Sequence, residues 1–134
     1  MARRLSVGFD IGSTTVKAVV VDMATDQVIW CDYQRHDTKQ PEKSLEFLKR
    51  FESEIPDFKE ASTRLFVTGS GGGNIGRFLG AKFVQEVNAV SLAVEKLYPN
   101  CNSVVELGGQ DAKIIIFKED PETDRKSTRL NSSH

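Results

Sequence analysis

The feature that most constrains the fold is a run of three apolar segments near the N-terminus, separated only by short turns. Residues 5–9, 16–21 and 28–35 are rich in β-branched and aromatic side chains, and the turns between them carry glycine, hydroxyl and acidic residues. Such segments are typical of β-strands, and short links between consecutive strands favour antiparallel pairing. We therefore predict that the chain begins with an antiparallel meander.

The periodicity changes after this meander. Leu45, Leu48 and Phe51 recur at a spacing of three, with Phe47 flanking them, which predicts a helix over 41–51. Further elements are predicted as a strand over 64–68, helices over 74–79 and 88–97, and strands over 103–107 and 112–117. The order strand-strand-strand-helix-strand-helix-strand is that of a ribonuclease-H-like lobe. The predicted class is α/β with a mixed five-stranded sheet, followed by the first hairpin of a second lobe.

Three parts are predicted along the chain. Residues 1–100 are expected to form the first ribonuclease-H-like lobe, and residues 101–123 to begin a second lobe that is cut short. Residues 124–134 read Asp-Arg-Lys-Ser-Thr-Arg-Leu-Asn-Ser-Ser-His, and codons for them can be chosen that spell an adapter oligonucleotide used in short-read sequencing. We expect this tail to be a sequencing artefact that is disordered and dispensable, on an open reading frame that is truncated.

Composition argues against several classes of protein. No apolar run approaches the roughly 20 residues that span a bilayer, and the N-terminus lacks a signal-peptide pattern. Cys31 and Cys101 are too few and too far apart for a disulfide scaffold, so a cytoplasmic location without membrane attachment is expected. The net charge of −1, which becomes more negative without the basic tail, gives no electrostatic case for a nucleic-acid partner.

Candidate chemistry lies first in a glycine turn at 10–17, Asp-Ile-Gly-Ser-Thr-Thr-Val-Lys, at the end of the first strand. Gly12 permits close approach of the backbone to a ligand, and successive N–H groups can form an anion-binding nest to which the Ser13 and Thr14 hydroxyls add donors. Asp10 could hold Mg²⁺ through its waters against phosphate oxygens. The alternative is a plain hairpin with polar turn residues, and the sequence contains no Walker loop.

A second glycine turn lies at 106–113, Glu-Leu-Gly-Gly-Gln-Asp-Ala-Lys, between two apolar strands. Its two glycines allow close approach of the backbone. Glu106 and Asp111 are candidates for holding Mg²⁺ or positioning a water, and Gln110 could orient a nucleophilic water, as glutamines do in some GTPases. A hairpin with surface carboxylates is the alternative. The presence of two such turns supports phosphate binding by both.

With these motifs, the chain resembles the superfamily of sugar kinases, heat-shock chaperones and actin, in which two phosphate-binding hairpins lie on facing domains. Within it, residues 8–17, 68–71 and 106–113 look like those of BadF/BadG/BcrA/BcrD-type ATPases, the activators of 2-hydroxyacyl-CoA and benzoyl-CoA-type dehydratases or reductases. Residues 33–36 and 83–90 resemble the long multidomain members most closely. The resemblance implies an actin-like ATPase that binds ATP and Mg²⁺ and couples hydrolysis to electron transfer to a dehydratase or reductase partner.

The two turns and the resemblance together define an expected site. Catalytic roles are expected for Asp10, Glu106, Gln110 and Asp111, with Mg²⁺ held by Asp10 and Asp111. Nucleotide contacts are expected from Gly12, Ser13, Thr14, Thr15, Lys17, Gly69, Gly108 and Gly109. The glycine-rich segment 69–73 could instead be only a flexible connection. A sugar or acid kinase of the same superfamily, a non-catalytic actin-like or chaperone-like switch, and an inert fragment stay open as alternatives.

An iron–sulfur cluster is implied by the family but not expected in this polypeptide. In the family a [4Fe–4S] cluster bridges a homodimer through two cysteines per subunit. The first cysteine of the short members would fall near Ala89, and the second belongs to a Cys-Ala-Gly-Gly-Thr-type stretch that this sequence lacks. Cys31 and Cys101 match neither position. His36 is a lone histidine after a strand, for which a surface or turn role is expected.

Overall fold

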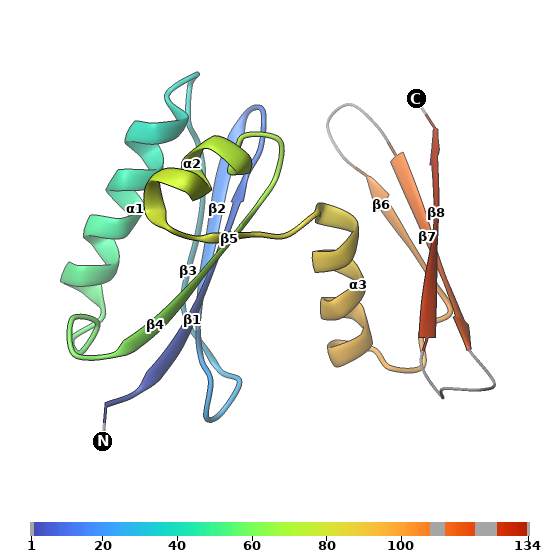
Figure 1. Ribbon diagram of the computed structural model, residues 1–134, viewed down its shortest axis with the longest axis horizontal. Coiled ribbons are helices and arrows are strands. Elements are labelled where there is room, and N and C mark those ends of the chain that lie inside the picture. The colour runs from blue at the N-terminus through green and yellow to red at the C-terminus, as the bar shows by residue number, and fades with distance from the viewer. Residues whose placement is uncertain (1, 108–111, 120–125, 134) are drawn as a thin grey trace. The chain divides into compact units, whose positions relative to one another are not determined.

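The computed structural model describes residues 2–107, 112–119 and 126–133 of the 134-residue chain (Figure 1). These residues divide into two compact units, Met1–Gln85 and Glu86–His134. The division precedes the helix predicted over 88–97, whereas the lobe boundary predicted from the sequence follows that helix.

The first unit contains a five-stranded mixed sheet in the order β3-β2-β1-β4-β5 (Figure 1). Strands β1 (Arg4–Ile11), β2 (Thr15–Asp22) and β3 (Val28–Arg35) form the predicted antiparallel meander. Strand β4 (Ser62–Thr68) pairs parallel to β1, and the short strand β5 (Lys82–Phe83) pairs parallel to β4. The predicted α/β class with a mixed five-stranded sheet is confirmed. Strand β5 was not predicted, because two residues carry no periodicity.

One face of this sheet carries the core of the first unit. Alternate residues of β1 and β2 are buried: Leu5, Val7, Phe9, Ile11, Val16, Ala18 and Val20. Helix α1 (Gln40–Glu54) covers this face and buries Phe47 and Phe51 completely. The Phe9 and Phe51 rings lie 5.7 Å apart between centroids. The i, i+2 period of the strands thus meets the helix face that carries Phe47 and Phe51. Leu45 of the predicted stripe is exposed instead, because the buried face is rotated toward Phe47.

Helix α2 (Gly72–Leu79) packs against β4 and begins two residues before the predicted start. A Cβ on Gly72 would lie 2.7 Å from Val67 Cγ1, so only glycine allows this close approach. The helix ends at Gly80, whose φ of 64° is in the left-handed region that favours glycine. Within the described part of the chain, no helix is long and apolar enough to cross a bilayer.

The second unit contains helix α3 (Glu86–Leu97) and a three-stranded antiparallel sheet in the order β6-β7-β8. Strands β6 (Ser103–Leu107) and β7 (Ala112–Glu119) form the hairpin predicted from the sequence. The Lys113 ammonium lies 2.8 Å from Glu86 Oε2 and links β7 to the start of α3. This ion pair helps to explain why α3 groups with the second unit.

The tail differs from the expectation of disorder. Strand β8 (Lys126–Ser133) pairs antiparallel with β7 along its whole length, from Ala112 opposite Ser133 to Glu119 opposite Lys126. The prediction of disorder was therefore wrong for the backbone of these residues. The physical reason is that an edge strand presents unpaired N–H and C=O groups, which pair with an adjacent extended segment almost regardless of its side chains. It stays a prediction that residues 124–134 are dispensable and that they derive from a sequencing adapter.

Candidate functional site

The turn between β1 and β2 is closed by its own backbone. Gly12 N–H donates to the Thr15 carbonyl at 2.9 Å. Ser13 and Thr14 lie between them with exposed side chains. Among the described residues, the Ser13 and Thr14 N–H groups have no hydrogen-bond acceptor. The turn therefore offers two N–H groups and two hydroxyls to a ligand, which is the donor set of an anion-binding nest.

Charged side chains of both signs lie next to this turn. Asp10 and Lys17 are opposite each other in the β1–β2 register, and Lys17 Nζ lies 3.2 Å from Asp10 Oδ2. Their side chains are 37% and 46% exposed, so the pair is accessible and adds little to stability. Lys17 Nζ also lies 5.5 Å from the centroid of the Tyr33 ring. The site thus combines a cation for a phosphate with a carboxylate for a metal ion.

The glycine segment after β4 packs directly against this turn. Gly71 N–H donates to the Ile11 carbonyl at 2.8 Å. Gly69 has a φ of 94°, and a Cβ there would lie 2.3 Å from Ile11 O and 2.7 Å from Asp10 Oδ1. Thr68 pairs in register with Asp10, and its buried hydroxyl oxygen has no partner within the described residues. The segment is therefore fixed beside Asp10 at this point and is not a loose connection.

Two residues that the sequence did not identify as part of the site contact the turn from within. His36 is only 3% exposed, and its Nε2 lies 3.0 Å from the Gly12 carbonyl oxygen. Gln40 Nε2 donates to the same oxygen at 2.7 Å. Of the surface or turn role expected for His36, the surface part was wrong because the residue is buried, whereas the residue does follow a strand and contact a turn. The β2–β3 register, with Thr15 opposite Arg35, is the signal that would have placed the residue after β3 beside the turn before β2.

The second predicted turn is only partly described. Gly108, Gly109, Gln110 and Asp111 lie outside the described residues. Glu106 on β6 is half-buried, and its Oε2 is buried without a hydrogen-bond partner in the described ranges. The two turns belong to different units, so a site that combines them stays a prediction.

The metal-binding potential of the described residues is limited but suits Mg²⁺. No three His, Cys, Asp or Glu side chains within those ranges gather as a metal site. Mg²⁺ usually keeps several waters and takes only one or two carboxylates together with substrate phosphates. Asp10 is partly exposed beside a nest of N–H groups and fits that role. For a [4Fe–4S] cluster the sequence offers only Cys31 in the first unit and Cys101 in the second, and neither is at a position that the family resemblance implies.

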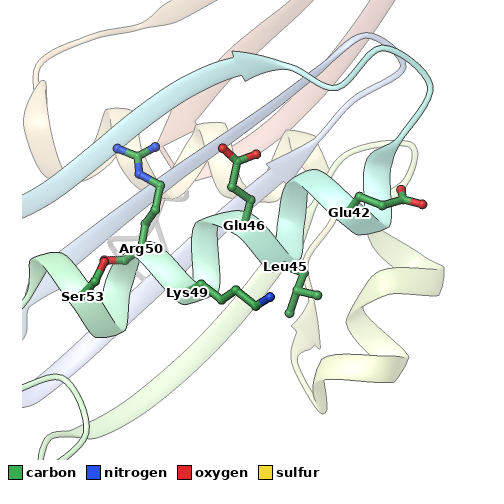
Figure 2. Close-up of a pocket in the computed structure, with 6 residues that line it drawn as sticks. All are labelled: Glu42, Leu45, Glu46, Lys49, Arg50 and Ser53. Carbon is green, nitrogen blue, oxygen red and sulfur yellow. The ribbon is translucent and has the colours of Figure 1, made fainter.

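Among the described residues, surface hollows lie on α1 and between α1 and α2. The larger, of about 520 Å³, is lined by one helix alone, and Figure 2 shows its six side chains along α1: Glu42, Leu45, Glu46, Lys49, Arg50 and Ser53. Arg50 forms ion pairs with Asp32 on β3 and with Glu54. This surface is a charged outer face of α1. The smaller hollow, of about 250 Å³, lies between α1 and α2 and includes Gln40 and Gly71 in its lining.

Comparison with known proteins gives a fold but no close relative. No protein-family model and no curated protein sequence matches the chain. Among solved structures, component A of the (R)-2-hydroxyglutaryl-CoA dehydratase of Acidaminococcus fermentans matches with 20% identity and a TM-score of 0.65, over 95% of this chain and 47% of that chain. The activator of the 2-hydroxyisocaproyl-CoA dehydratase from Clostridium difficile, with bound ADPNP, matches with 23% identity and a TM-score of 0.66, over 96% of this chain and 46% of that chain.

A Ppx/GppA family member from Aquifex aeolicus matches with 15% identity and a TM-score of 0.60, over 98% of this chain and 51% of that chain. The chain therefore has the predicted actin-like ATPase fold, and it spans about half the length of these solved structures.

Proposed function

We propose that this chain is the N-terminal, nucleotide-binding part of an ATPase that activates an acyl-CoA dehydratase or reductase. The observation that carries the proposal is the β1–β2 turn, where outward N–H groups, two hydroxyls, Lys17 and Asp10 gather at the end of a buried strand. Solved structures with this fold include one dehydratase component and one dehydratase activator with bound ADPNP. Because the chain spans about half of their length, the activity is proposed for the whole protein.

In this proposal the turn binds the phosphates of ATP. The N–H groups and hydroxyls of Ser13 and Thr14 donate to phosphate oxygens, with Thr15 beside them, and Lys17 supplies a positive charge. Asp10 holds Mg²⁺ through water, and the ion supplies further positive charge against the phosphates. Gly69 allows the adjacent segment to lie against Asp10.

The remaining steps are assigned to the second lobe and to the partner. Gln110 orients the attacking water, Glu106 and Asp111 complete the acid and metal groups, and Gly108 and Gly109 approach the phosphates. Hydrolysis is coupled to closure of the two lobes and to electron transfer to the dehydratase or reductase, from a homodimer of the whole protein in the cytoplasm. These assignments rest on the resemblance of residues 106–113 to the activator family.

A second candidate function is hydrolysis of an inorganic polyphosphate. The observation in its favour is the TM-score of 0.60 to the Ppx/GppA family member and of 0.58 to an exopolyphosphatase from Cytophaga hutchinsonii. Backbone N–H groups recognise phosphate and not a base, so the turn alone serves either substrate. The identities of 15% and 13% are lower than the 23% to the dehydratase activator, which is why the activator is preferred.

The proposal is tested by titrating the full chain with MgATP, magnesium tripolyphosphate and adenosine, followed by amide chemical shifts. We expect shifts centred on residues 12–15 with both phosphate ligands, with a dissociation constant of about a millimolar. Adenosine should cause no shift, because the pocket for the base belongs mainly to the second lobe, and ATP turnover should be undetectable. Asp10→Asn should remove the dependence of binding on Mg²⁺ while the melting temperature is retained.

Two results would contradict the proposal. The absence of shifts at residues 12–15 with either phosphate ligand would show that the turn is an ordinary hairpin. Micromolar affinity, or hydrolysis that Asp10→Asn abolishes, would show that the first lobe acts without the second.

A further inference from the structure

Two side-chain donors from different elements converge on a single backbone oxygen in the β1–β2 turn. His36, just after β3, and Gln40, the first residue of α1, both donate to the carbonyl of Gly12, at 3.0 Å and 2.7 Å. A carbonyl oxygen has two lone pairs, so both hydrogen bonds can form at once. A carbonyl in an exposed turn would otherwise accept from water, so this arrangement fixes its direction.

The burial of His36 that this contact requires is energetically unfavourable for the imidazole. A carbonyl only accepts, so Nε2 is the ring nitrogen that carries a proton and donates. The other ring nitrogen, Nδ1, is buried and has no hydrogen-bond partner among the described residues. An unpaired buried polar atom is unfavourable, so the imidazole gains little from this position except the bond to the turn. The main chain of His36 holds the same turn, since its N–H donates to the Thr14 carbonyl at 3.1 Å.

The direction of the Gly12 carbonyl determines the direction of a ligand-facing group. In a planar trans peptide the C=O and the next N–H point in opposite directions, and the described chain has no cis peptide. With the Gly12 oxygen drawn inward to His36 and Gln40, the Ser13 N–H must point outward. Ser13 is exposed, and its N–H has no acceptor among the described residues.

We propose that His36 and Gln40 are positioning residues that orient the Gly12–Ser13 peptide for phosphate. The inference rests on the proposed function. It adds the two residues that orient the anion-binding nest of the β1–β2 turn before a ligand binds. Gly71 is also needed for this arrangement. A Cβ at Gly71 would lie 2.6 Å from Gln40 Oε1 and would displace the Gln40 amide from Gly12. Neither His36 nor Gln40 touches the phosphate itself.

The test measures affinity for magnesium tripolyphosphate in variants of the full chain, from the chemical shifts of Ser13 and Thr14. His36→Leu and Gln40→Leu should each weaken binding by about three- to tenfold, which corresponds to the net contribution of one hydrogen bond. The double variant should weaken it by more than tenfold. His36→Gln, which keeps a donor in place of Nε2, should stay within about twofold of the parent chain.

Controls separate positioning from general destabilisation. Gln34→Leu removes a glutamine that bonds to Asp32 and Lys43 instead of the turn, so it should leave the affinity unchanged. Affinities are measured well below the melting temperature of each variant. If His36→Leu does not fold, Gly71→Ala displaces Gln40 without altering either donor and should weaken binding as Gln40→Leu does.

The outcomes are distinguishable. If the parent chain binds tripolyphosphate at residues 12–15 but the His36→Leu, Gln40→Leu and Gly71→Ala variants bind it equally well, the positioning role is overturned and the proposed function stands. If the parent chain shows no shift there, both are overturned. Loss of affinity in His36→Gln equal to that in His36→Leu would also overturn the role, because the donor is present in the former.

Discussion

The two glycine hairpins of this chain carry similar motifs but differ in what surrounds them. The β1–β2 turn is contacted by His36, by Gln40 and by the Gly71 backbone, and the strand that leads into it is buried. The β6–β7 hairpin instead has apolar side chains on an uncovered face, with Leu107 80% exposed and Val105 59% exposed. The β1–β2 turn is thus held in place by residues outside its own motif, and a motif alone does not supply that support.

The contrast between the two units is tested most directly by destabilising each unit separately. Leu5→Ala, at a fully buried position of β1, should lower the free energy of unfolding of the first unit by about 3 kcal/mol. Ile115→Ala, equally buried in the second unit, is the matched substitution. The single tryptophan, Trp30, packs against Phe51 and reports on the first unit alone. Urea unfolding followed by its fluorescence should shift with Leu5→Ala only.

A shift of similar size with Ile115→Ala would show that the two units unfold as one. The two-state treatment would then apply to the whole chain and not to each unit.

A glycine exchange tests whether the first turn depends on close backbone approach. Gly69→Ala should destabilise the first unit by about 2 kcal/mol, because the residue has a positive φ and its Cβ would meet the Ile11 carbonyl. Gly73→Ala is the control, since a Cβ there meets nothing within 4 Å and the residue lies in α2. The control should be neutral or slightly stabilising. Thermal melting of both variants measures the difference, and equal melting temperatures would contradict the packing of the glycine segment.

Removing residues 124–134 should affect the second unit alone, and weakly. Strand β8 pairs with β7 and with no other strand in the described sheet, so the Trp30 transition should not change. Amide protons of β7 that point toward β8 should exchange faster, because they lose their acceptors. Hydrogen exchange of the truncated chain checks both points. A drop of several degrees in the melting of the first unit would refute the prediction that the tail is dispensable.

The smallest expected effect is a change in how the melting temperature of the first unit depends on pH. The Arg50 guanidinium lowers the pKa of the Asp32 carboxyl and also that of Glu54. A carboxyl whose pKa is lower in the folded state stabilises that state above its unfolded pKa and loses the contribution as the pH falls. Between about pH 5 and about pH 3 the melting temperature should therefore fall less steeply in Arg50→Met than in the parent chain. The difference should be small because the groups are solvent-screened, and a steeper fall in the variant would contradict the assignment.

Local pattern was enough to predict most elements and the first turn. The apolar alternation of β1 is a property of the residues themselves, and it places Asp10 and Gly12 near a strand end. The burial of His36 could not be read in this way, because it depends on the register of β2 with β3. Strand β5 and the pairing of β8 likewise depend on which neighbouring edge is open. The sequence thus predicts the motif itself. The residues that hold the turn in place can be identified only once the pairing of the strands is known.

The pairing of β8 with β7 has a practical consequence for protein engineering. An edge that accepts a polar segment without apolar periodicity will also accept other extended segments, such as an affinity tag or a reporter linker fused after Glu119. Such a fusion would be incorporated into the sheet, and its accessibility to a resin or a protease would fall. An attachment before Arg4, at the other end of the chain, leaves that edge untouched.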